Sequence, residues 1–201
     1  TPKYLNTSRS PVFDKGRLLY ALDMARDSIK HEGCAVIVEG YMDAIAAHEH
    51  GYTNVVASMG TALTDHQVAH LRKLANTFVL ALDPDAAGQE ATLRSLESSW
   101  RVFEQKTAAR HRGLTLYHRG QPTGSISVAL LPLGNDPDQL IRDDPQRWDQ
   151  LIAAATPLLD YLMDTLATKF DLSTSQGKAG AATQLFPLIT GLENPFEQDR
   201  Y

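Results

Sequence analysis

The 201-residue chain has little of several features that mark particular classes of protein. It has a single cysteine, Cys34, so no disulfide can form within the chain, and we expect a buried structural thiol in a reducing cytoplasm. No apolar run approaches the roughly 18 residues that a membrane-spanning helix needs. The first eleven residues contain no apolar signal-peptide core. We therefore expect a cytoplasmic location and no membrane partner.

Two common kinds of catalytic site are also missing from the sequence. There is no phosphate-binding P-loop and no recognisable triad of nucleophile, base and orienting residue. His66 and His70 have the i, i+4 spacing of a metal pair, but no third ligand stands out nearby, and we interpret them as a solvated or partly buried helix face. The chain does not begin with methionine, so we expect a piece of a longer protein.

The charge balance is acidic, with a net charge of −5 and a sequence pI of about 5.8. Contacts with phosphates need clustered lysine and arginine, so this balance argues against a free-standing nucleic-acid-binding protein. The contents of 43% hydrophobic and 21% charged residues are those of an ordinary globular protein with a real core.

Short apolar segments alternate with helix-like segments over the first half of the chain. Predicted strands are CAVIV at 34–38, NVVAS at 54–58 and TFVLALD at 77–83, and predicted helices are 15–31, 41–51, 64–74 and 87–105. Asp14 and Thr64 are suitable caps for two of these helices, and Gly33 is a suitable stop. The alternation predicts an α/β fold, with a mostly parallel central sheet and helices on both faces.

The pattern changes after about residue 106. Two extended segments are predicted at 114–118 and 126–131, and helices are predicted at 146–154, 157–170 and 175–190. We therefore predict three parts: a connector and helix at 1–33, an α/β domain with a small β extension at 34–144, and a C-terminal helical subdomain at 145–201.

Acidic residues stand at the ends of two of the predicted strands. Glu39 follows the first strand, and Asp83 and Asp85 follow the third. Ligands of an open parallel sheet bind outside the carboxyl ends of its strands, so we expect these carboxylates to converge there. Their mutual repulsion is relieved by a divalent cation, and an all-oxygen ligand set suits Mg²⁺ or Mn²⁺ rather than Zn²⁺. Gly40 and Gly88 leave room for close approach of a phosphate or backbone.

Several motifs in a fixed order give the chain a recognisable pattern. They are Glu39-Gly40-Tyr41-Met42-Asp43, the loop Ser58–Thr64, and Asp83-Pro84-Asp85-Ala86-Ala87-Gly88. This set resembles the Toprim domain, the metal-binding fold of bacterial primases, type IA and type II topoisomerases and some nucleases. The flanks resemble bacterial primase, with PKYLN at 2–6, KGRLLY at 15–20 and GNDPD at 134–138. The resemblance extends over essentially the whole chain.

The resemblance to bacterial primase implies a role for each matching residue. The implied catalytic and metal-binding acids are Glu39, Asp83 and Asp85, the implied supporting metal ligands are Asp43, Asp136 and Asp138, and the implied nucleotide-binding or nucleic-acid-binding residues are Lys3, Lys15, Gly40 and Gly88. The chain would then be the second half of a primase polymerase core. That core is a DNA-directed RNA polymerase, a nucleotidyltransferase that makes short RNA primers during replication.

The implied cofactor is Mg²⁺ or Mn²⁺, and zinc would belong only to an N-terminal domain absent from this chain. The implied partners are a single-stranded DNA template, an RNA primer and ribonucleoside triphosphates. Replicative helicase and single-strand-binding protein would be contacted through parts absent here. The acidic charge fits a half that holds metals, because the basic face would lie in the other half.

Simpler interpretations of the same residues stay open. Asp83 and Asp85, or Asp136 and Asp138, could only cap a helix and occupy its first turn, and Asp43 could only be a first-turn acid. Lys3 and Lys15 could be solvated. The alternative functions are a Toprim nuclease or topoisomerase module, or a non-catalytic nucleic-acid-binding module.

Overall fold

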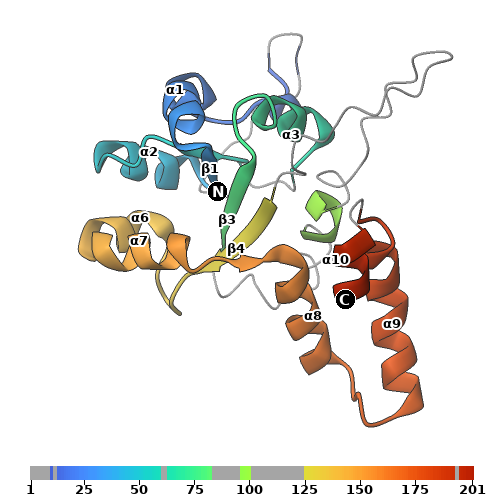
Figure 1. Ribbon diagram of the computed structural model, residues 1–201. Coiled ribbons are helices and arrows are strands. Elements are labelled where there is room, and N and C mark those ends of the chain that lie inside the picture. Colours follow the sequence, from blue (N-terminus) through green and yellow to red (C-terminus); the bar gives the residue numbers. More distant parts are fainter. Residues whose placement is uncertain (1–9, 11–12, 60–62, 83–95, 101–124, 193–194) are drawn as a thin grey trace, which may run out of the picture.

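The computed structural model describes residues 10, 13–59, 63–82, 96–100, 125–192 and 195–201 (Figure 1). Its centre is a sheet of five strands in the order β2-β1-β3-β4-β5. The strands are β1 Cys34–Val38, β2 Val55–Ala57, β3 Thr77–Leu82, β4 Ser125–Leu130 and β5 Thr156–Pro157. The first four pair in parallel, and β5 is antiparallel to β4. The predicted mostly parallel sheet is confirmed.

Helices surround this sheet and form the C-terminal part of the chain. Their bounds are η1 Lys15–Arg17 (a 3-10 turn), α1 Leu22–Glu32, α2 Tyr41–Glu49, α3 Asp65–Leu71, α6 Pro137–Asp143, α7 Pro145–Ala153, α8 Leu158–Lys169, α9 Ser175–Ile189 and α10 Pro195–Arg200. A helical stretch also covers 96–100. The predicted strand at 114–118 and most of the predicted helix at 87–105 lie outside the described residues.

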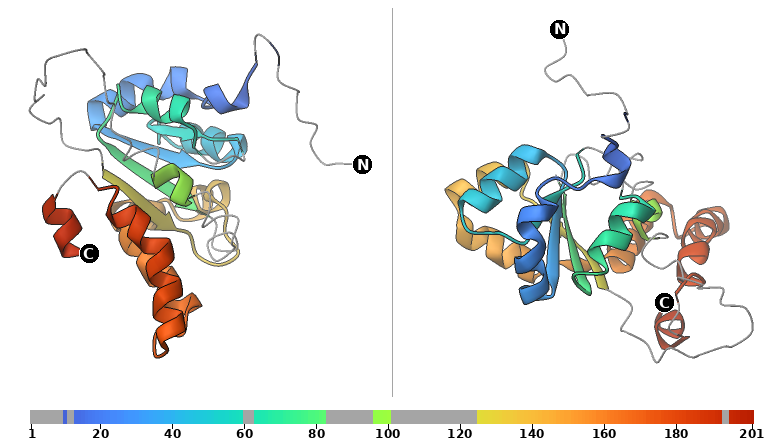
Figure 2. Two further views of the ribbon diagram at one scale, coloured as in Figure 1. Left: turned by 90° about the vertical axis from the view of Figure 1, so that its right-hand side faces the viewer. Right: turned by 90° about the horizontal axis from the view of Figure 1, so that it is seen from above.

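Each strand sends alternate side chains to opposite faces of the sheet. In β1, Ala35 and Ile37 belong to one apolar cluster, while Val36 and Val38 belong to the other. The first cluster includes residues of α1, α3, α8 and α9, and the second includes residues of α2, α6 and α7. Figure 2 shows α6 and α7 on the opposite side of the sheet from α9. Helices therefore cover both faces, as parallel sheets require.

The predicted helix from residue 15 to residue 31 is wrong over its first part. Residues 15–17 form only a 3-10 turn, and Tyr20 then pairs with Ala57 at the end of β2 through backbone hydrogen bonds of 2.9 and 3.1 Å. Ala21 has a φ of 61°, a left-handed conformation that no helix interior contains. The tertiary pairing of Tyr20 therefore overrides the local helix pattern. Gly33 ends α1 with a φ of 67°, as predicted.

The tail helices share the core of the sheet. Buried Leu158, Leu159 and Leu162 of α8 and Leu188 of α9 pack in the cluster that contains β3 and β4. The short strand β5, just before α8, extends the sheet beyond β4. Sequence patterning predicted α8 and α9 but neither β5 nor α10. Of the described helices, none is long and apolar enough to cross a membrane.

Candidate metal and nucleotide site

The candidate site lies at the carboxyl edge of the parallel sheet. Glu39 is exposed and comes directly after β1. Strands β1 and β3 are hydrogen-bonded neighbours, with Ile37 opposite Leu80, so the ends of both strands reach the same edge. The Leu131 N–H donates to the Leu82 carbonyl oxygen at 3.1 Å, which places the end of β4 beside that of β3. Glu39 therefore stands next to the point where the chain leaves β3.

Four of the residues assigned to the site from the sequence lie outside the described residues. They are Lys3, Asp83, Asp85 and Gly88. The described part of β3 ends at Leu82, immediately before the first of the two aspartates in the sequence. The roles of these four residues stay predictions.

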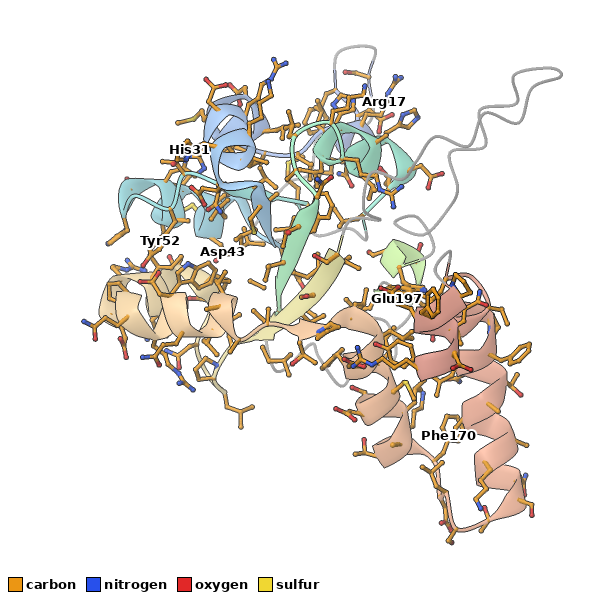
Figure 3. The ribbon with its side chains drawn as sticks, viewed as in Figure 1. Arg17, His31, Asp43, Tyr52, Phe170 and Glu197 are labelled. Atoms are coloured by element: carbon orange, nitrogen blue, oxygen red, sulfur yellow. The ribbon has the colours of Figure 1, made fainter. Side chains whose placement is uncertain are left out.

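Gly40 and Asp43 form the start of helix α2. The Gly40 N–H donates to Asp43 Oδ2 at 3.0 Å, so the carboxylate closes the first turn of the helix. A Cβ atom added to Gly40 would meet that Oδ2 at 2.7 Å, closer than real Cβ contacts. An alanine at this position would therefore displace the Asp43 carboxylate. Asp43, labelled in Figure 3, has the first-turn role that its position suggests, and its role as a metal ligand stays a prediction.

We predict that Gly40→Ala destabilises the protein by about 1 kcal/mol. The added methyl group pushes Asp43 away from the Gly40 N–H and removes the hydrogen bond that closes the first turn. Urea unfolding would measure the difference, with Gly16→Ala as a contrast because a Cβ there meets other atoms only at ordinary contact distances of 3.5 and 3.6 Å. Equal stability of Gly40→Ala and wild type would mean that the Asp43 carboxylate moves without cost.

Asp136 and Asp138 begin helix α6, which packs against α2. Asp136 caps the helix, and its Oδ1 accepts from the Gln139 N–H at 3.0 Å. Asp138 Oδ1 accepts from Arg142 Nη2 at 2.7 Å. Burial raises the pKa of Asp138, the neighbouring Asp136 carboxyl raises it further, and Arg142 opposes both effects. The structure thus gives both aspartates a local helical role, and metal binding by them stays a prediction.

Lys15 lies in η1, which packs on the start of α3 near the end of β2. The Thr64 hydroxyl donates to the Gly16 carbonyl oxygen and holds η1 there. Further along, the Tyr20 ring lies 6.0 Å from the Tyr41 ring, between centroids. Since Tyr41 follows Glu39 by two residues, Tyr20 lies close to the part of the candidate site that Glu39 occupies. Lys15 lies five residues before Tyr20, and its role in binding stays a prediction.

Gln67 is a positioning residue that the sequence interpretation missed. Its side chain is fully buried, and its Nε2 donates to the Lys15 carbonyl at 3.0 Å and to the Leu18 carbonyl at 2.8 Å. Its Oε1 accepts from the Thr64 N–H at 3.0 Å. The spacing Thr64-x-x-Gln67 is that of a capping box, which could have predicted the last bond but not the first two. Gln67 fastens η1 to α3.

The described acids do not form a complete metal site by themselves. Within the described part of the chain, no group of three or more His, Cys, Asp or Glu residues could hold a metal ion. Glu39 is nevertheless an exposed carboxylate at the end of β1. Its hard oxygen atoms are suitable as part of the ligand set of Mg²⁺ or Mn²⁺.

Comparison with known families agrees with this geometry. A model of the Toprim domain matches residues 33–111, which include β1, Glu39 and β3. A second model, described as the DnaB-helicase binding domain of primase, matches residues 159–201, the helical tail. This second match differs from the expectation that helicase contacts lie only outside the chain.

Several curated proteins resemble the whole chain. A DNA primase of Deinococcus radiodurans is 35% identical over 96% of this chain and 30% of its own length. A DNA primase of Escherichia coli K12 is 33% identical over 94% of this chain and 30% of its own length. The chain therefore spans about 30% of the length of these relatives.

Solved structures give the same result. The Escherichia coli primase catalytic core matches 100% of this chain and 59% of its own chain, with a TM-score of 0.80 and 30% identity. A DnaG primase catalytic domain bound to single-stranded DNA matches with the same values, and a DNA primase domain from Pseudomonas aeruginosa matches with a TM-score of 0.78 and 33% identity. The Toprim model, the curated relatives and the solved cores agree along the chain, which therefore belongs to the bacterial DNA primase family.

Proposed function

We propose that the chain is the metal-binding half of a primase polymerase core, which synthesises short RNA primers on single-stranded DNA. The observation that carries the proposal is the position of Glu39, exposed after β1 and beside the end of β3 in a chain of the primase family. Acids at the carboxyl edge of a parallel sheet are suited to hold divalent cations against phosphates.

The proposed reaction is nucleotidyl transfer. The 3′-hydroxyl of the primer attacks the α-phosphorus of a ribonucleoside triphosphate, a new phosphorus–oxygen bond forms, and pyrophosphate leaves with the electrons of the broken bond. Bound Mg²⁺ or Mn²⁺ would lower the pKa of the hydroxyl and stabilise the leaving group. Glu39, Asp83 and Asp85 would hold the metal, with Asp43, Asp136 and Asp138 in support.

Other groups of the chain would position the nucleotide. Gly40 lies at the start of α2, where the helix dipole favours a phosphate, and its own N–H donates to Asp43 Oδ2. Lys15 lies on η1, which Gln67 and Thr64 hold against α3, and its ammonium group would pair with a phosphate oxygen. Lys3 and Gly88 would have similar roles.

The remaining parts of the machinery would lie elsewhere in the primase. The chain spans about 30% of the length of its relatives and carries a net charge of −5, so we expect most of the basic surface for the template and primer to lie in the rest of the primase. We expect the isolated chain to make primers poorly or not at all. In the cell the complete protein would act in the bacterial cytoplasm.

The helical tail has a proposed partner of its own. Because residues 159–201 match the DnaB-helicase binding domain of primase, we propose that this tail takes part in contact with the replicative helicase. The same residues also fall inside matched structures of primase catalytic cores, so the tail would connect the two activities. Packing of α8 and α9 on the central sheet supports a rigid connection.

Crystals soaked with Mn²⁺ and a non-hydrolysable ribonucleoside triphosphate test the proposed site. We expect anomalous scattering about 2.2 Å from a Glu39 carboxylate oxygen, with Asp83 and Asp85 as further ligands. The same soak of a Glu39→Gln crystal should show a weaker peak. A nucleotide that binds with its metal away from these three acids would contradict the assignment.

A further inference from the structure

A groove of about 650 Å³ lies between helices α1 and α3, on the sheet face opposite α2 and α6. It is lined by Arg17, Leu18, Leu19, Leu22, Asp23, Arg26, Lys30, His70, Lys73 and Leu74. Its volume falls within the range of sites that bind ligands. Arg17 belongs to η1 and Leu18 follows it, and none of the lining residues is among those assigned to the candidate metal site.

The rim of the groove is basic, although the chain as a whole is acidic. Arg17, Arg26, Lys30 and Lys73 contribute four positive charges, and Asp23 contributes the one carboxylate of the lining. All five side chains are exposed. The ion pairs found among the described residues, Arg142–Asp138 and Arg200–Asp160, lie elsewhere. The rim is therefore complementary to a negatively charged partner.

The floor of the groove is aliphatic. Leu18 is 42% exposed, and Leu22 and Leu74 are partly exposed beside buried Leu19. The described lining contains no phenylalanine, tyrosine or tryptophan, and His70 is its one ring on which a nucleic-acid base could stack. Single-stranded nucleic acids commonly bind through such stacking, whereas leucines surrounded by charges suit the apolar face of an amphipathic helix.

The groove is held open by a fixed frame. The Gln67 side chain ties the Lys15 and Leu18 carbonyls to α3 by bonds of 3.0 and 2.8 Å. On the other side, the backbone pairing of Tyr20 with Ala57 fixes the entrance to α1. Both walls are thus set before any partner binds, which lowers the entropic cost of binding.

We propose that this groove binds an acidic amphipathic helix of a partner protein. Its leucine-type side chains would lie on Leu18, Leu22 and Leu74, and its carboxylates would pair with the basic rim. Helix α1 has 11 residues, so a partner helix of about three turns matches the length of the groove. The proposal adds a protein partner to the chain and does not depend on primer synthesis.

Fluorescence anisotropy with a designed peptide tests the proposal on the 201-residue chain. The probe is a labelled peptide of about 16 residues built from Glu-Leu-Leu-Glu repeats, long enough for four helical turns. We expect it to bind, and the double variant Arg26→Glu/Lys73→Glu to weaken binding on the order of tenfold. Leu18→Ser should weaken binding too. Lys169→Glu/Lys178→Glu, with the same charge change on the tail, should leave binding within about twofold.

Two further probes separate the protein partner from other anions. A peptide of Glu-Ser-Ser-Glu repeats has the same charge without the apolar face and should bind much more weakly. Oligothymidylate should not displace the leucine peptide. Equal binding of both peptides, displacement by oligothymidylate, or no binding at all would overturn the proposal. Thermal melts of each variant identify any that fail to fold, and methyl shifts of Leu22 and Leu74 in the unaltered chain report contact independently.

Discussion

Replacing Glu39 by glutamine in the complete primase is expected to reduce primer synthesis by on the order of 100-fold or more, with little change in folding. Glutamine keeps the size of the side chain but removes the negative charge that would hold the metal. Because Glu39 is exposed after β1, its replacement breaks no core packing. Incorporation of labelled ribonucleotides on a single-stranded template measures the loss, and thermal unfolding measures the stability.

Glu49→Gln provides the matched control for this experiment. Glu49 is an exposed glutamate at the other end of α2, so the same chemical change occurs on the same helix away from the sheet edge. Its variant should synthesise primers at the wild-type rate. If Glu39→Gln is also as active as wild type, Glu39 is not a metal ligand. A loss of activity that excess Mn²⁺ partly restores would identify the defect as weakened metal binding.

Most of the α/β architecture could be predicted from the sequence because local patterns and tertiary contacts agree there. Four of the five residues of β1 are buried, with side chains on both faces of the sheet, as a central parallel strand requires, and the position of Glu39 follows from the end of that strand. Thr64 caps α3 as predicted, because its side chain accepts from the Gln67 N–H. The motif from Glu39 to Asp43 likewise lies where β1 ends and α2 begins, so its position also follows from local sequence.

The parts that sequence patterning missed depend on contacts between distant residues. Tyr20 lies in a stretch with a helical apolar pattern, yet its backbone pairs with Ala57, 37 positions away, and breaks the helix. Strand β5 contains only Thr156 and Pro157 and exists because β4 offers a free edge. The basic groove between α1 and α3 likewise combines residues that are separated by about 50 positions. No local pattern reports such pairings.

Replacement of the buried Gln67 by leucine should destabilise the protein by about 3 kcal/mol. Leucine has a similar volume, so the packing changes little. It leaves the Thr64 N–H and the Lys15 and Leu18 carbonyls without their side-chain partner inside the protein. A buried polar group that loses its hydrogen bond costs roughly 1–3 kcal/mol. Urea unfolding of the variant and the wild type measures the difference.

Gln67→Glu divides the effect between the two ends of the side chain. Glutamate can still accept from the Thr64 N–H, but it cannot donate to two carbonyl oxygens and sets a negative charge against them. It should therefore be at least as destabilising as leucine. Gln139→Leu, on the exposed face of α6, should stay within about 0.5 kcal/mol of wild type. If Gln67→Leu is as stable as wild type, packing alone holds η1. If its free energy of unfolding falls as predicted, Gln67 is the residue that positions both Lys15 and the wall of the groove.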